Sequence, residues 1–274
     1  HDPPGLTQLR AEHPACDIVT GPLSAALFGD AELVVASPGV AVAGPACDPA
    51  IARAIAQGKK FVGDVELFAW EQNELAKKGK RPRMIGITGS NGKSTVTAMA
   101  EAMCRAAGLR TVAAGNIGLP VLDAALTAGE SGQPDVYVLE LSSFQLETTS
   151  TLKVDAATML NLTQDHLDRY FGMADYAAAK ARIFRHVGVQ VLNRQDPGSM
   201  AMKKDGVTVT SFGTDVTAKG DYRLDMGTNE LCERHEAFMR MADLPVAGTH
   251  NALNALAAVA LCRGIGIEMA PLVE

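Results

Sequence analysis

Short apolar runs alternate with longer amphipathic stretches along the whole chain, a pattern typical of alternating strands and helices. In the first eighty residues the apolar runs predict short strands, and stretches with apolar residues three and four positions apart predict helices. The predicted strands are residues 17–20, 32–36 and 60–63, and the predicted helices are residues 49–57 and 65–78.

The remainder of the chain continues the same alternation. Its predicted strands are residues 83–88, 111–114, 136–141, 156–160, 189–192 and 207–212, and its helices include residues 96–107 and 251–263. Strands separated by helices indicate a parallel sheet with helices on both faces. The pattern therefore predicts a doubly wound α/β fold for this part.

A basic stretch at residues 77–83, marked by Gly79 and Pro82, separates the two parts. Glycine and proline in a charged segment are typical of a linker, so we expect one domain over residues 1–80 and a second over 81–274. The positive charges are also compatible with contact to a nucleotide, but a solvated connector is the more common role.

Composition narrows the class of protein. The apolar fraction is 47% and the charged fraction 20%, which is typical of a globular, soluble chain. The net charge of −6 argues against nucleic acid as a partner, and no apolar run reaches the roughly 18 residues of a membrane span. Five scattered cysteines without a C-x-x-C pair favour reduced thiols in a cytoplasmic protein over disulfides or a zinc site.

The strongest chemical signal is the segment from Gly86 to Thr95, with sequence GITGSNGKST, between a predicted strand and a predicted helix. A glycine-rich turn in this context directs backbone N–H groups and the positive end of a helix dipole at a phosphate. The lysine supplies a charge for the outer phosphates, and the following serine supplies a hydroxyl ligand for Mg²⁺. The general phosphate-loop pattern places glycine where this chain has Ile87.

Polar residues also follow three other predicted strands, at Gly115–Gly118, Glu140–Glu147 and Asn161–Tyr170. Ligands of doubly wound sheets bind at the carboxyl ends of the strands, so we expect these loops to share one site. Glu140 is the best candidate for an Mg²⁺ ligand, although a helix N-cap or a solvated strand end is an equal alternative. His166 taken alone is more often structural, and only the convergence of loops favours a functional role.

These motifs together resemble the Mur ligases, the ATP-dependent amide ligases of peptidoglycan precursor synthesis. The loop TGSNGKST lacks the first glycine of the general pattern, as this family does. The stretches after Gly115, Leu139 and Asn161, together with Ala36–Gly39 and Gly63–Phe68, resemble the branch of the family that adds D-glutamate to UDP-N-acetylmuramoyl-L-alanine. The resemblance implies a partial Rossmann-like N-terminal domain that binds the sugar nucleotide, followed by a P-loop ATPase-type central domain.

The resemblance also implies a mechanism and site residues. ATP would phosphorylate the carboxylate of the sugar nucleotide, and the amine of D-glutamate would then displace phosphate. Lys93 would contact the outer phosphates, Ser94 and Glu140 the first Mg²⁺ ion, and His166 the second. Lys180 falls where the family has a carbamylated lysine that binds the second ion, whereas the sequence alone indicates an ordinary solvated lysine.

Further positions carry over in the same way. The resemblance assigns the nucleotide loop to Gly89, Ser90, Asn91, Gly92, Lys93, Ser94 and Thr95. It places Asn251 and Asn254 near the adenine, and Ser37 and Gly39 in the loop near the sugar nucleotide. The contacts with the muramoyl-alanine part are assigned to Asn116, Ser142 and Gln145. Arg169 and Tyr170 are expected to line the cleft. Asn251 and Asn254 are equally compatible with first-turn residues of a helix that Thr249 caps.

The family has three domains, and the sequence suggests that the first begins part-way here and that the third is absent. We therefore expect these 274 residues to form no amide alone. We also expect a monomer in the bacterial cytoplasm. Two alternatives stay open: a relative of folylpolyglutamate synthase, which should lack Ser142–Gln145, and a P-loop kinase, regulatory NTPase or nucleotide-binding module that forms no amide.

Overall fold

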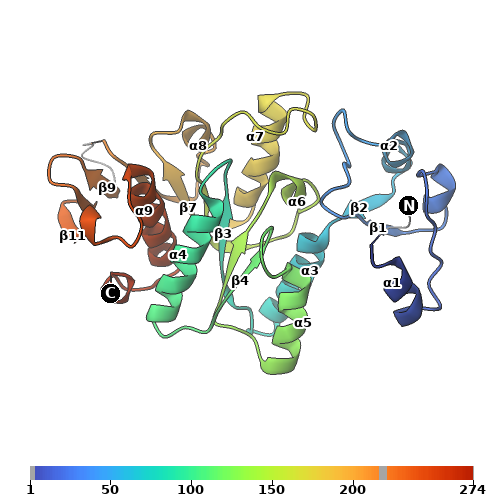
Figure 1. The fold of residues 1–274 in the computed structure, drawn as a ribbon, viewed down its shortest axis with the longest axis horizontal. Helices are drawn as coiled ribbons and strands as arrows, with labels where there is room; N and C mark the ends of the chain where they lie inside the picture. The colour runs from blue at the N-terminus through green and yellow to red at the C-terminus, as the bar shows by residue number, and fades with distance from the viewer. Residues whose placement is uncertain (1–3, 216–220, 274) are drawn as a thin grey trace.

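A computed structural model describes residues 4–215 and 221–273 of the chain. The elements of the first part lie at one end of the molecule's longest axis, the main sheet lies in the middle, and a group of short strands lies at the other end (Figure 1). These three groups follow one another in the same order along the chain, and residues 249–264 then return to the main sheet (Figure 1).

The first part contains a small parallel β–α–β unit. Its elements are α1 (Leu6–Glu12), η1 (Ala25–Phe28), β1 (Leu33–Val35), α2 (Pro49–Ala56) and β2 (Lys60–Val62). Helix α2 begins where Asp48 accepts a hydrogen bond from the Ala50 N–H at 2.7 Å and a proline occupies the first position. Strand β1 pairs with β2 in parallel, and Phe28, Ile51 and Ala54 form the small core.

The second part is built around a larger sheet. Its helices are α3 (Asp64–Lys77), α4 (Lys93–Ala106), α5 (Val121–Ser131), α6 (Ser143–Glu147), α7 (Met173–Ala181), η2 (Arg182–Phe184), α8 (Pro197–Ala201), η3 (Met241–Asp243), α9 (Thr249–Gly264) and η4 (Ala270–Leu272). Its strands are β3 (Arg83–Thr88), β4 (Thr111–Gly115), β5 (Val136–Glu140), β6 (Val154–Met159), β7 (Val187–Asn193), β8 (Thr208–Gly213), β9 (Tyr222–Asp225), β10 (Glu230–Glu233) and β11 (Glu236–Arg240).

The strand order is β11-β10-β9-β8-β7-β6-β3-β5-β4, and the pairs from β4 to β9 are parallel. Strand β3 lies between β5 and β6, and Ile87 of β3 pairs with Glu140 of β5. The carboxyl ends of these three strands therefore meet at one edge of the sheet. This juxtaposition brings the segment after Thr88 close to the predicted acidic residue.

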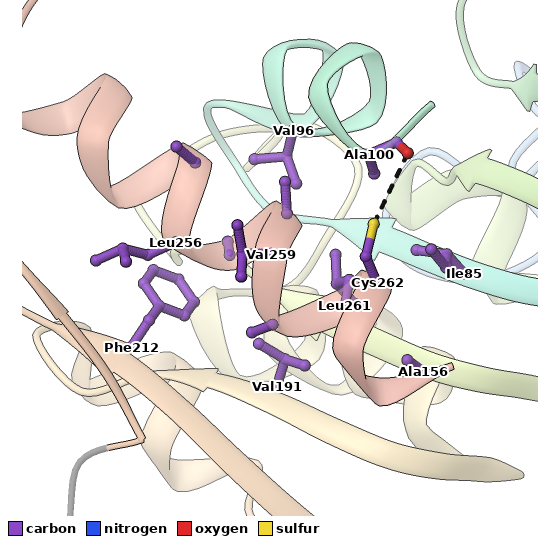
Figure 2. Packing of buried hydrophobic residues seen from close by; sticks show 14 of the residues in the cluster. Ile85, Val96, Ala100, Ala156, Val191, Phe212, Leu256, Val259, Leu261 and Cys262 are labelled. Atoms are coloured by element: carbon purple, nitrogen blue, oxygen red, sulfur yellow. Dashed lines mark hydrogen bonds between the residues drawn. The ribbon is translucent and has the colours of Figure 1, made fainter. Parts of the chain in front are cut away.

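Helices cover both faces of the sheet, which confirms the predicted doubly wound α/β class. On one face, α4 and α9 pack over Ile85, Ala156 and Val191, and the Cys262 thiol lies 3.8 Å from the Ala100 carbonyl oxygen (Figure 2). The other face is covered by α3, α5 and η2, with their apolar residues buried in a second cluster. The core thus holds β3 from both faces of the sheet.

Helix α3 joins the first part of the chain to the main sheet. The ring of Phe68 packs against Tyr137 of β5 with ring centroids 5.2 Å apart, so α3 contributes to the core around β5. After α3, Arg81 forms an ion pair with Asp155 at 2.7 Å, near the start of β6. The basic stretch therefore reaches the amino ends of the strands, opposite the glycine-rich loop, which favours a connector over a nucleotide contact; the domain boundary at residue 80 stays a prediction.

The predicted strands and helices agree with the structure to within a few residues, with one exception in the first part and one at the far end of the sheet. Residues 17–20 form no strand, because this apolar run finds no neighbouring strand to pair with in the described part of the molecule. Strands β9, β10 and β11 were not predicted, and the pairs β9–β10 and β10–β11 are antiparallel. Each of these strands is only four or five residues long, and in β10 and β11 the order of residues does not follow a period of two. Residues 216–220 lie outside the described residues.

None of the helices in the described ranges is both long and apolar enough to cross a lipid bilayer.

Candidate active site

The glycine-rich loop connects the end of β3 at Thr88 to the start of α4 at Lys93. Gly89 has φ +154° and Gly92 has φ +85°, conformations that L side chains rarely adopt. A Cβ atom on Gly92 would also lie 2.8 Å from Oδ1 of Asn254. Ile87 occupies the position of the missing glycine and is fully buried in β3, which continues to Thr88.

The loop following β6 holds the glycine-rich loop in place. The Ser90 N–H donates to the Asn161 carbonyl at 2.9 Å, and the Asn91 N–H donates to Asn161 Oδ1 at 2.8 Å. The Ser90 hydroxyl is 3.0 Å from the Thr163 N–H, which donates to it. These two loop amides are used internally, whereas the amides of the first turn of α4 have no partner within a helix and can donate to an anion.

Two lysines meet at a single carbonyl of this loop. Lys93 Nζ donates to the carbonyl oxygens of Gly89 at 3.0 Å and Ser90 at 3.2 Å, while Lys180 Nζ donates to Gly89 at 2.9 Å. Lys180 and the loop are far apart along the chain, and the residue types alone gave no indication that α7 would bring Lys180 to the loop. The structure thus joins two of the predicted site residues around one backbone oxygen.

Lys180 is buried, with 2% of its surface exposed, and its ammonium group lies 4.7 Å from the centre of the Tyr176 ring. Burial lowers the pKa of Lys180 to about 7; the positive charge of Lys93 acts in the same direction and Asp165 opposes it. Lys180 therefore loses its proton more readily than a solvated lysine does, which yields a neutral, nucleophilic amine. The solvated lysine that the sequence alone indicates is not observed.

Glu140 is the last residue of β5, which lies beside β3, the strand that leads into the glycine-rich loop. Only 2% of the Glu140 surface is exposed. Among the described residues its carboxylate forms no ion pair and accepts one hydrogen bond, from Asn116 Nδ2 at 3.3 Å. The equally buried Glu66 instead accepts hydrogen bonds from Ser150, Thr151 and Trp70. Glu140 is thus a buried carboxylate with few partners, an arrangement that suits a cation ligand.

His166 lies in the loop after β6 with φ +53°, and its Nε2 atom is 3.3 Å from a carboxylate oxygen of Asp165. The His166 ring packs on the Phe144 ring with centroids 4.7 Å apart. The Tyr176 ring is its second aromatic neighbour, with ring centroids 6.1 Å apart. The Tyr176 hydroxyl is in turn 3.3 Å from the Ser90 hydroxyl. His166 is therefore connected to the glycine-rich loop through an aromatic side chain.

The predicted substrate residues Ser142 and Gln145 form a capping box at the start of α6. The Gln145 N–H donates to the Ser142 hydroxyl at 3.2 Å, and the Ser142 N–H donates to Gln145 Oε1 at 3.1 Å. Gln145 Nε2 also donates to Asp64 Oδ2 at 3.3 Å, at the start of α3. In this structure these residues order the segment that follows Glu140.

The other predicted residues lie at the rims of this region. Asn254 Nδ2 donates to Asn251 Oδ1 at 3.3 Å, and Asn254 also lies against Gly92, so the start of α9 adjoins the loop. The N-cap of α9 is Gly248, not Thr249. Ser94 and Thr95 follow Lys93 in the first turn of α4.

Ser37 and Gly39 belong to a turn in which the Val40 N–H donates to the Ser37 carbonyl at 2.9 Å. Within residues 4–215 and 221–273, this turn forms no hydrogen bond with the glycine-rich loop. It meets instead Arg169, whose side chain donates to the Gly39 carbonyl at 3.2 Å.

Sequence reasoning did not assign roles to Asn161, Tyr176 and Glu147, which hold the loops together. Asn161 lies two residues after the end of β6, and that position was the available signal. Glu147 and Tyr176 gave none, because their contacts depend on how α6 and α7 pack. Within the described ranges, no group of three or more His, Cys, Asp or Glu residues could hold a metal ion by itself.

The fold and the glycine-rich loop are those of a P-loop protein of the α/β class, and comparison with known proteins gives the family. The model of the Mur ligase middle domain matches residues 87–262, and that of the MurD-like N-terminal domain of Mur ligases matches residues 1–63. The chain therefore belongs to the Mur ligase family. This confirms the resemblance inferred from the loop sequences.

Two curated relatives show where in the family the similarity is high. The UDP-N-acetylmuramoylalanine–D-glutamate ligase of Methylobacillus flagellatus is 51% identical over 269 residues, covering 97% of this chain and 56% of that protein. The enzyme of the same name from Thiobacillus denitrificans is 50% identical, with 99% and 58% covered. The chain thus spans a little over half the length of these relatives.

Solved structures confirm the fold. The UDP-N-acetylmuramate:L-alanyl-γ-D-glutamyl-meso-diaminopimelate ligase from Neisseria meningitides matches with a TM-score of 0.61 at 20% identity, covering 100% of this chain and 86% of that one. MurF from Acinetobacter baumannii matches with a TM-score of 0.59 at 22% identity, covering 83% and 49%.

Proposed function

We propose that the whole protein is an ATP-dependent ligase that joins D-glutamate to UDP-N-acetylmuramoyl-L-alanine in peptidoglycan synthesis, in the bacterial cytoplasm. The observation that carries this proposal is the meeting of Lys93, Lys180 and a glycine-rich loop beside the buried carboxylate of Glu140. The relatives that carry this enzyme name are about half identical to the chain over nearly all its length.

The chemistry follows from the weakness of a carboxylate as an acyl donor. In the first step an oxygen of the alanine carboxylate attacks the γ-phosphorus of ATP, and ADP leaves. In the second step the amine of D-glutamate attacks the carbonyl carbon, loses a proton, and expels inorganic phosphate as the amide forms. Both steps bring anionic oxygens together, so the site must supply positive charge.

The residues present fit Mg²⁺ ions shared with the nucleotide. Mg²⁺ prefers oxygen ligands and is often held by one or two carboxylates together with substrate phosphates, so a complete protein cage is not needed. Glu140 and Ser94 would hold the first ion, and His166 and Lys180 the second. When bound, the ions neutralise charge on the transferred phosphoryl group. Lys93 would leave the Gly89 and Ser90 carbonyls and contact the outer phosphates.

We assign the remaining positions in the same way. Gly89 to Thr95 would cradle the phosphates, while Asn251 and Asn254 would lie near the adenine. Ser37 and Gly39 would contact the uridine diphosphate. Asn116 would reach the muramoyl-alanine from beside Glu140, and Ser142 and Gln145 would shape that subsite through their capping box.

Lys180 is proposed to react with CO₂: the neutral amine attacks the carbon, loses a proton and becomes a carbamate. A pKa of about 7 makes the amine available, so carbamate formation should increase as the pH rises through 7. We expect removal of CO₂ and bicarbonate to lower ligase activity reversibly. A carbon-13 carbamate signal should form from labelled bicarbonate in the wild type and be absent from Lys180→Ala.

Lys180→Ala should regain part of its activity when a small carboxylate such as formate is added, because the carboxylate replaces the missing oxygen ligand. Lys77→Ala, which removes an exposed lysine, serves as the control and should respond to CO₂ like the wild type. Full activity of Lys180→Ala, or a wild type indifferent to CO₂, would contradict the carbamate.

The direct test of the function is an amide assay with the whole protein, ATP, Mg²⁺, the sugar nucleotide and either D- or L-glutamate. We expect one amide product, formed with the D-isomer, and release of phosphate that requires both the sugar nucleotide and the amine. Phosphate release independent of both substrates would indicate a plain NTPase and overturn the proposal. Amide formation on a folate in place of the sugar nucleotide would indicate a folylpolyglutamate synthase-like enzyme.

A further inference from the structure

Arg169 connects three segments that are far apart in the sequence. Its guanidinium group pairs with Glu147 of α6 through Nε at 3.3 Å and Nη2 at 2.8 Å. The same group donates to the carbonyl oxygens of Gly39 at 3.2 Å and Val40 at 3.2 Å, in the turn that follows β1. One side chain therefore binds the first part of the chain to the loop after β6 and to the helix after β5.

This ion pair is buried, with 6% of the Arg169 side chain and 9% of the Glu147 side chain exposed. Breaking a buried pair by removing one partner leaves an uncompensated charge, so the pair holds its two elements in a defined geometry. The two backbone carbonyls occupy further N–H groups of the planar guanidinium, whose donors have a fixed arrangement. A lysine could not reproduce these contacts.

The segment that follows the turn also packs against the backbone of Arg169. A Cβ atom on Gly44, which has φ +79°, would lie 2.2 Å from the Arg169 carbonyl oxygen. Only glycine permits this approach. The contact between the two parts of the chain thus has a side-chain component through the guanidinium and an independent backbone component through Gly44.

From Arg169 the contacts continue to the candidate active site. The guanidinium lies 4.2 Å from the centre of the Phe144 ring, and Phe144 packs on the His166 ring at 4.7 Å. His166 contacts Tyr176, which meets the Ser90 hydroxyl of the glycine-rich loop at 3.3 Å. A continuous series of packed groups therefore runs from Gly39 to the glycine-rich loop.

We propose that Arg169 is a positioning residue that couples the turn at Ser37–Val40 to His166 and the glycine-rich loop. Through this coupling, a sugar nucleotide bound at the turn and a nucleotide with Mg²⁺ bound at the loop strengthen each other's binding. The identity of the two ligands rests on the proposed function, whereas the coupling between the two segments does not. Because coupling is reciprocal, it is measurable from either ligand.

The first test measures hydrogen–deuterium exchange in the whole protein without ligands. Arg169→Lys retains the charge but loses the forked contacts, so exchange should increase both in residues 37–44 and in residues 161–170. The matched control is Arg182→Lys, since Arg182 is a partly buried arginine that donates to the Thr149 carbonyl at 3.1 Å. The control should leave both segments as in the wild type. An increase confined to one segment in Arg169→Lys would overturn the coupling.

A second variant breaks the same contact from the other side. Gly44→Ala should push the segment after the turn away from Arg169 and raise exchange in both segments while the ion pair with Glu147 remains. Gly58→Ala is its control, because Gly58 has a similar φ of +87° but nothing lies within 4 Å of its added Cβ. Equal exchange in the two alanine variants would contradict the role of the contact.

The final test measures the Kd of the sugar nucleotide with and without a non-hydrolysable ATP analogue and Mg²⁺. We expect the analogue to lower the Kd of the sugar nucleotide in the wild type by a factor of at least about five. The controls Arg182→Lys and Gly58→Ala should show the same factor as the wild type. In Arg169→Lys and Gly44→Ala the factor should fall close to one, a change that lower stability alone would not produce. An unchanged factor would overturn the proposal. If the wild type binds no sugar nucleotide, the proposed function fails, and the exchange results still decide the coupling.

Discussion

Replacing Lys93 with alanine is expected to lower kcat/KM for amide formation by about a thousandfold or more. Lys93 projects its ammonium group onto the carbonyls of Gly89 and Ser90, at the place where the loop would receive the outer phosphates. Without it, the charge that develops on the transferred phosphoryl group would lose a positive side chain of the loop. Steady-state kinetics of the whole protein, with the amide quantified by mass spectrometry, measures the effect.

The loss should not come from unfolding. The side chain makes two hydrogen bonds to backbone carbonyls, so Lys93→Ala should lower the Tm by only a few degrees. The charge of Lys93 also lowers the pKa of Lys180, so the variant should raise that pKa, and the assay is repeated at alkaline pH to separate the two effects. Recovery of activity at alkaline pH, or turnover like the wild type, would show that Lys93 does not act on the phosphates.

Glu140→Gln is expected to lower kcat about a hundredfold and to raise the Mg²⁺ concentration at half-maximal activity. The substitution preserves the shape of the side chain and the neighbouring Asn116 but removes the buried negative charge. A neutral amide is a much weaker ligand for Mg²⁺ than a carboxylate, because the ion prefers charged oxygen donors. A Mg²⁺ titration of the steady-state rate measures both changes.

Glu66→Gln provides the matched control, since Glu66 is equally buried but caps the backbone of Ser150 and Thr151. Burial raises the pKa of Glu66, and hydrogen bonds from Ser150 and Thr151 outweigh this and lower the pKa below its ordinary value. The control should lower thermal stability while the Mg²⁺ dependence stays unchanged. If both variants respond to Mg²⁺ alike, Glu140 is a structural carboxylate and the assignment of the first ion is wrong.

The periodicity of apolar residues predicted the main sheet because its parallel strands are buried on both faces and form continuous apolar runs. Strand β3 and helix α4 therefore agree closely with expectation, and so does the place of Glu140 at a strand end. Strands β10 and β11 escaped prediction because each is short and carries glutamate residues at both ends or at its start, which masks alternation. The apolar run at 17–20 shows the reverse error: a run without a partner strand forms no sheet.

The candidate site likewise contains some features that the sequence predicted and others that it could not predict. Local order within one loop was predictable, since Gly89 and Gly92 adopt conformations that glycine allows and the sequence places them beside Lys93. The burial of Lys180 against Gly89 was not predictable from residue types, because it depends on how α7 packs on the loop after β6. Arg169 illustrates the same limit: we expected it to line a cleft, and instead it is buried in an ion pair.

The central claim is that the carboxylate of the sugar nucleotide is activated by phosphorylation before the amine attacks. Supplying UDP-N-acetylmuramoyl-L-alanine with both carboxylate oxygens labelled with oxygen-18 tests it, with ATP, Mg²⁺ and D-glutamate present and the whole protein as catalyst. We predict that each amide formed transfers one labelled oxygen to inorganic phosphate and retains the other in its carbonyl. Amide formation with unlabelled phosphate, or phosphate release without any amide, would contradict the account.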